Sequence, residues 1–205
     1  MQTFVTLLDL ACGQPFRAED DVRSRRWQLI VAAALASLAC AAIWGLAAGS
    51  GDLRLALANV YKVPMVILLS TLCAVPAGLL TWKLTGSELR LTDLLIGFFT
   101  GVFAGTLVLA VLAPLVALYY HTSAWAGPML GLGSTFTALL VATIVFIRGV
   151  VRRAPPNLAR APLLMPVLVV VAMQLATLIQ FIAVASPILP ETTVFDGGID
   201  QMIGR

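Results

Sequence analysis

Charged residues are scarce in this chain of 205 residues, at 11%, whereas hydrophobic residues make up 60%. Soluble domains carry roughly 25% charged residues and about 45–50% apolar residues. A single globule of this length could not bury so many apolar side chains, so we expect lipid to be the solvent for much of the surface. The shortage of charge therefore excludes an ordinary soluble domain.

Cysteine and histidine are also scarce, with three cysteines and a single histidine, His121. The cysteines form no CxxC pair, and no histidine stands at the spacing of a metal site. Paired carboxylates in an apolar stretch, a nucleophile with a nearby base, and a phosphate-binding loop are missing as well. We therefore predict no metal, no cofactor and no enzymatic activity. A nucleic-acid partner is excluded too, because no basic stripe with exposed aromatic residues occurs.

Long apolar segments dominate the rest of the chain. Each of them has the roughly 20 residues that cross the ~30 Å hydrocarbon core at about 1.5 Å per residue. The fold class predicted is all-α, a polytopic membrane protein with a bundle of five transmembrane helices. The predicted spans are residues 27–48, 61–82, 91–119, 127–147 and 163–186.

The segments outside these spans are short. We expect residues 1–26 to form a cytoplasmic segment, either with a short interfacial helix or as a partly ordered tail, because Gly13-Gln14-Pro15 interrupts an apolar stretch. Residues 50–60 are predicted to be a short polar loop, and residues 187–205 an extracytoplasmic tail.

Basic residues divide unequally between the two sides of these spans. Ten Lys/Arg residues fall on one side, and three on the other: Arg54, Lys62 and Arg205. Positive residues in short flanks remain in the cytoplasm, so we expect a cytoplasmic N-terminus and an extracytoplasmic C-terminus. The ten residues on the cytoplasmic side are Arg17, Arg23, Arg25, Arg26, Lys83, Arg90, Arg148, Arg152, Arg153 and Arg160.

The second span carries the most unusual residues. Lys62 lies at its start, where its ammonium group either snorkels to the headgroups or faces the bundle interior. Pro64 is expected in the first helical turn, where the N–H groups have no partners anyway, whereas Pro76 lies inside and should kink the helix. The groove at that kink is the first place to look for a site.

Two other spans carry packing and polar signals. Gly97, Gly101 and Gly105 recur every fourth residue of the third span, so a neighbouring helix can approach closely. In the fifth span Gln174 and Gln180, together with Thr177, are predicted to form a polar face that makes hydrogen bonds between helices.

The second span, with Asn-Val-Tyr-Lys-Val-Pro at 59–64 and Pro76, precedes a glycine-rich third span and a glutamine-bearing fifth. In this order of features the chain resembles an uncharacterised bacterial family of multispan membrane proteins. Its plan of five spans with the N-terminus inside is similar in topology to Yip1-domain membrane proteins. These resemblances imply a membrane bundle, and they supply no functional residues.

Two functions are compatible with these patterns. The first is a non-enzymatic accessory or scaffold subunit of a membrane complex in a bacterial inner membrane, with a membrane-protein partner or a homo-oligomer. Its arginine-rich segment would meet anionic lipid headgroups or a cytoplasmic partner through Arg148, Arg152, Arg153 and Arg160. The alternative is a small transporter or channel component that uses the proline-broken second helix as its gate.

Overall fold

Apolar helices account for nearly all of the structure, a computed structural model that describes residues 2–14, 23–86, 89–123, 125–154 and 160–185. Within these ranges the chain forms helices and no strand. Five of the described helices, α2 to α6, are long and apolar enough to cross a membrane. The protein is therefore an all-α, multi-pass membrane protein, which confirms the predicted fold class. The helices are α1 (Gln2–Ala11), α2 (Arg23–Ala48), α3 (Leu53–Leu84), α4 (Leu91–Thr122), α5 (Ala126–Arg153) and α6 (Arg160–Ala185).

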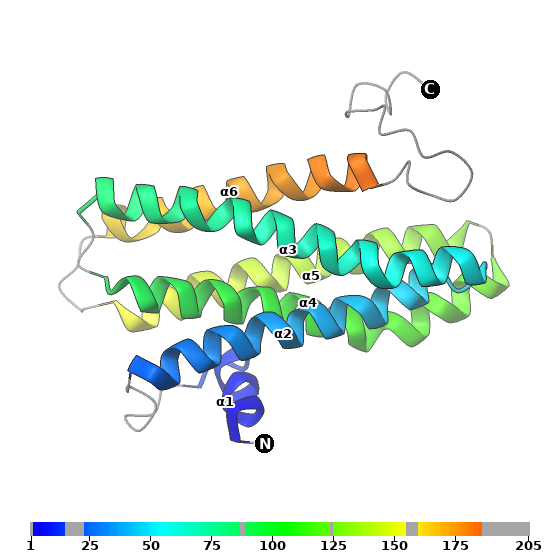
Figure 1. The fold of residues 1–205 in the computed structure, drawn as a ribbon, viewed down its shortest axis with the longest axis horizontal. Helices are drawn as coiled ribbons and strands as arrows, with labels where there is room; N and C mark the ends of the chain where they lie inside the picture. The colour runs from blue at the N-terminus through cyan, green and yellow to red at the C-terminus, as the bar shows by residue number, and fades with distance from the viewer. Residues whose placement is uncertain (1, 15–22, 87–88, 124, 155–159, 186–205) are drawn as a thin grey trace.

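The five long helices lie along a common axis and alternate in direction (Figure 1). α3 and α6 lie side by side on one side of the bundle, while α2, α4 and α5 form the other. α2 joins the two sides because it packs against both α3 and α4, whereas α6 packs mainly against α3. α2 begins and α6 ends at opposite ends of the bundle, as an odd number of spans requires (Figure 1).

The largest buried cluster lies near the end of the bundle where α3 ends and α4 begins. It brings together side chains from α3, α4, α5 and α6, and the rings of Phe98 and Phe146 meet edge to face at 5.5 Å. The two sides of the bundle are therefore packed together at this end. The buried members of the cluster are Ala74, Leu89, Leu94, Phe98, Phe146, Val150, Val167 and Val170.

The second long helix begins at Leu53, about two turns earlier than predicted. Asp52 caps it, because its side chain accepts a hydrogen bond of 2.9 Å from the backbone N–H of Arg54. Ala56 is buried, and a Cβ on Gly49 would lie 2.5 Å from its Cα, so the new first turn packs closely on the end of α2. The prediction of a polar loop through residue 60 is wrong for this reason: the cap and the close packing outweigh the polarity of the segment.

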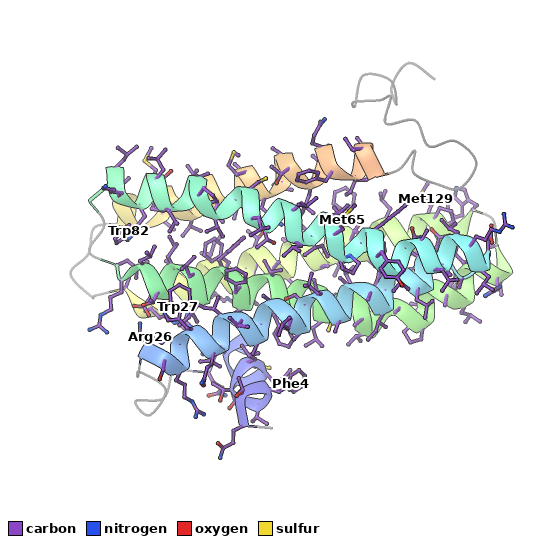
Figure 2. The ribbon with its side chains drawn as sticks, in the orientation of Figure 1. Phe4, Arg26, Trp27, Met65, Trp82 and Met129 are labelled. Atoms are coloured by element: carbon purple, nitrogen blue, oxygen red, sulfur yellow. The ribbon has the colours of Figure 1, made fainter. Side chains whose placement is uncertain are left out.

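The N-terminal segment forms a helix, α1, that packs against the sides of α2 and α4. Leu7 is buried with Leu29 and Phe103, and the ring of Phe4 meets that of Phe103 at 6.0 Å. Figure 2 shows Phe4 on α1, below the main bundle. The sequence predicts two alternatives for this segment, a short helix or a partly ordered tail. Residues 2–11 are helical, as in the first alternative. Residues 15–22 and the predicted tail at 187–205 lie outside the described residues.

Candidate functional site

A buried ion pair lies at the end of the bundle where α2 and α4 begin. The Arg26 Nη1 donates to Asp93 Oδ1 at 3.0 Å and to Thr92 Oγ1 at 2.8 Å. The two charged side chains are only 9% and 13% exposed. Figure 2 shows Arg26 at this end of the bundle. Asp93 lies in the first turn of α4, where the helix dipole also favours a negative charge.

A second guanidinium group, that of Arg153, lies within electrostatic range of this pair. Arg153 lies in the last turn of α5, and its Nη1 donates to the Gly149 carbonyl oxygen at 2.9 Å. Its charge is attracted by Asp93 and repelled by Arg26. A Cβ on Gly149 would lie 3.0 Å from that Nη1, and one on Gly97 would lie 3.6 Å away. The two glycines therefore leave the space that the Arg153 guanidinium group occupies between α4 and α5.

The four arginines predicted to meet lipid or a partner differ in how far their side chains are exposed. Arg148 and Arg152 are exposed, but Arg153 turns inward to the ion pair. Arg160 is the first residue of α6, and its side chain lies outside the described part. The sequence alone does not separate Arg153 from Arg152, because both stand in the same basic run. Only the packing of α5 against α4 decides that Arg153 is partly buried while Arg152 is exposed.

The glycine row of α4 faces α5. A Cβ on Gly101 would lie 2.7 Å from the Ala142 carbonyl oxygen, and one on Gly105 would lie 2.7 Å from that of Ala138. On Gly97 it would meet a Val150 methyl group at 3.0 Å. The two helix backbones therefore approach more closely than any side chain would allow.

A second polar contact joins α3 and α6 near their middles. The Gln174 Nε2 donates to Ser70 Oγ at 2.9 Å, and Ser70 Oγ in turn donates to the Ile67 carbonyl oxygen at 3.0 Å. Thr177 lies one turn further along α6, and its Oγ1 is 3.5 Å from the Ser70 carbonyl oxygen. Gln174 and Thr177 thus lie on the side of α6 that faces α3.

Gln180 does not lie on the side of α6 that faces α3. Its side chain is exposed, and it makes no hydrogen bond to any described residue. The prediction grouped it with Gln174 and Thr177, but six residues of an α-helix turn Gln180 about 120° away from Gln174. The residue therefore lies on the surface of the bundle.

Lys62 lies on the inward side of α3. The neighbouring Val63 and the Asn59 backbone meet Gly45 of α2, and Val66, one turn after Lys62, is buried. The Lys62 Nζ is itself buried and has no hydrogen-bond partner among the described residues. This position matches the second of the two alternatives, an ammonium group facing the bundle interior rather than the headgroups.

Both prolines of α3 lie inside an unbroken helix. The prediction of Pro64 in a first turn is wrong, because the helix already begins at Leu53. Each proline lacks an N–H, so each leaves one carbonyl of the preceding turn without its helical partner. Pro76 lies between Ala74, a member of the main buried cluster, and Gly78, which meets Val170 of α6.

Sequence reasoning missed the Arg26–Asp93 pair and the bond from Trp44 Nε1 to Ser134 Oγ, at 3.0 Å between α2 and α5. A signal for the first was present, since Arg26 and Asp93 fall at the same side of the predicted membrane. Pairing them would have followed from the rule that an acidic residue at the edge of a span needs a cation.

Comparison with known proteins adds no relative to these observations: no family model, no curated protein and no solved structure matches the chain. The resemblance to a bacterial multispan family and to the Yip1-domain topology stays a prediction.

Proposed function

We propose that this membrane protein is a non-enzymatic accessory or scaffold subunit of a complex in a bacterial inner membrane, with its N-terminus in the cytoplasm. The observation that carries this proposal is the cluster of Arg26, Asp93 and Arg153. It links three helices at the end of the bundle where Arg148 and Arg152 are exposed.

The cluster supports a role in which the protein offers a basic surface to a partner or to lipid, because the charges of the cluster hold the helices in position. Asp93 accepts a hydrogen bond from a guanidinium group of α2 and attracts the guanidinium group of Arg153 on α5, which favours the observed positions of α2, α4 and α5 at this end. The exposed Arg148 and Arg152 of α5 therefore lie on a part of the bundle whose helices are held in position. Such a surface suits anionic lipid headgroups or an acidic surface of a cytoplasmic partner.

The test is purification of the full-length protein from its native membrane in a mild detergent. We expect a stable heteromeric complex, and we expect the double charge reversal Arg148→Glu with Arg152→Glu to release the partner or the co-purifying anionic lipid. Arg54→Glu is the matched control, because Arg54 is also exposed but lies at the opposite end of the bundle. Recovery of the protein without any partner, and with the same lipid in all variants, would contradict the proposal.

A small transporter or channel component is the second candidate, and the buried Nζ of Lys62 favours it. A cation inside a membrane bundle whose ammonium group has no hydrogen-bond partner among the described residues is the kind of residue that marks a solute path. Its test is solute flux into vesicles that contain the purified protein. Lys62→Ala should abolish flux while the helical content stays unchanged, and Lys83→Ala, an exposed lysine at the other end of α3, should have no effect. Wild-type flux in the Lys62 variant would exclude this role for α3.

A further inference from the structure

Gln180 is an exposed polar side chain within an apolar, membrane-spanning stretch of α6. The stretch runs from Leu164 to Val184, and Gln180 lies one turn before its end. The side chain is exposed and makes no hydrogen bond to any described residue. Gln174 shows the contrasting case, because it is only 9% exposed and bonds to Ser70 of α3. Within the described part of the chain, one glutamine of α6 thus has a partner and the other has none.

Exposure has a different meaning for Gln180 than for the exposed hydroxyl groups of α5. The Thr137 hydroxyl donates to the Gly133 carbonyl oxygen of its own helix at 2.8 Å, so it is satisfied in lipid. A carboxamide has two N–H donors and a carbonyl acceptor, and lipid chains offer partners for none of them. A glutamine in this position therefore favours association with another helix.

Small residues lie on the same face of α6. Ala172 and Ala176 are exposed and stand eight and four residues before Gln180, so all three fall along one side of the helix. Alanine at these positions lets a second helix approach closely enough for the carboxamide to reach across. Among the described residues α6 packs mainly on α3, so none of the other described helices covers this face.

We propose that α6 is a dimer interface, and that its occupant is α6 of a second copy of this chain, joined through paired Gln180 carboxamides. Two copies insert into the membrane with the same orientation, so their α6 helices run parallel and a two-fold axis along the membrane normal sets Gln180 opposite Gln180. A carboxamide is self-complementary, because the N–H of one copy donates to the carbonyl oxygen of the other. The second copy thus supplies a polar partner at the correct depth, whereas a different protein would need its own polar residue at that level. This dimer goes beyond the accessory role and does not depend on which end of the bundle faces the cytoplasm.

The first test is cross-linking between copies of the full-length protein in lipid vesicles. Cys12, Cys40 and Cys73 are replaced by alanine, and Ala176→Cys is introduced in the proposed interface. A short thiol-reactive cross-linker should join two copies through residue 176. Leu140→Cys is the control, since Leu140 is equally lipid-facing, at 62% exposed, but lies on α5. Cross-linking of both variants to the same extent, or of neither, would overturn the proposal, and so would cross-linking of residue 176 to a different protein.

The second test needs no cysteine substitution. The dissociation constant of the dimer is measured in vesicles of increasing lipid-to-protein ratio, with the unmodified chain and with Gln180→Ala. One interhelical polar contact in a membrane corresponds to a weakening of about tenfold. Ile179→Ala is the matched control, because Ile179 lies beside Gln180 and is 53% exposed, but carries no hydrogen-bonding group. A monomeric unmodified chain at every ratio, or a Gln180→Ala variant that dimerises as tightly as the unmodified chain, would overturn the proposal.

Discussion

The α4–α5 pair and the α3–α6 pair are built from helices of comparable length but are joined by different chemistry. In the first pair, Gly101 and Gly105 bring the α4 backbone against the carbonyl oxygens of Ala142 and Ala138. In the second pair, the carboxamide of Gln174 bonds to the Ser70 hydroxyl, and Gly78 meets the side chain of Val170 rather than a backbone.

The difference shows two ways in which helices associate where lipid is as apolar as their side chains. Close packing gains dispersion energy along the whole contact, and each added atom would disrupt it. A single polar bond gains less, because the separated helices find other partners for the same groups. We therefore expect α2, α4 and α5 to form the more stable part of the bundle, and α6 to be held more weakly.

The largest effect should come from removing the carboxylate at the end of α4. Asp93→Ala leaves the guanidinium group of Arg26 without its ion-pair partner and removes the attraction on Arg153, and breaking a buried pair in this way costs about 3–5 kcal/mol. The measurement is the free energy of unfolding in detergent micelles. Asp52→Ala is the control, because Asp52 is exposed and caps α3, a contribution of about 1 kcal/mol. Equal losses in the two variants would mean that the cluster does not stabilise the bundle.

The next largest effect should appear at the glycine row. Gly101→Ala places a methyl group 2.7 Å from a backbone carbonyl oxygen, so the helices must separate, at about 1–3 kcal/mol. Gly133→Ala is the matched control, because a Cβ there would meet nothing within 4 Å. Unfolding of both variants in the same micelles measures the difference. If Gly101→Ala is as stable as Gly133→Ala, close packing does not hold α4 on α5.

The smallest effect should come from the polar bond of the other pair. Gln174→Leu removes the donor to Ser70, while the Ser70 hydroxyl keeps its bond to Ile67, so the expected loss is about 1 kcal/mol. A double-mutant cycle with Ser70→Ala isolates the coupling between the two side chains. A coupling energy of zero would show that the bond contributes nothing to the α3–α6 contact.

The bundle was predictable from the sequence because its signals are local. Apolar length identified five spans, and the four-residue spacing of Gly97, Gly101 and Gly105 identified a face suited to a close helix contact. The start of α3 was not predictable in the same way. Its extra turns depend on the Asp52 cap and on contact between Ala56 and Gly49, and the second of these is a tertiary contact.

The candidate sites were only partly predictable, because burial of a polar group depends on which helices meet. Gln174 and Gln180 are the same residue type in one span, yet one bonds to Ser70 and the other is exposed. Arg152 and Arg153 are adjacent, yet Arg152 is exposed while Arg153 is partly buried and is attracted by Asp93. In each case the sequence supplied the residue, while the neighbouring helix decided its role.

The relative stability of the two helix pairs can be measured directly by amide hydrogen exchange of the full-length protein in lipid nanodiscs. Exchange through local opening reports the free energy that holds each segment in place. We predict that the middle of α4, around Gly101, exchanges only through global unfolding, and that the middle of α6, around Gln174, exchanges at a lower free energy. Protection of α6 equal to or greater than that of α4 would contradict the claim that backbone packing holds this bundle together more strongly than its polar bond.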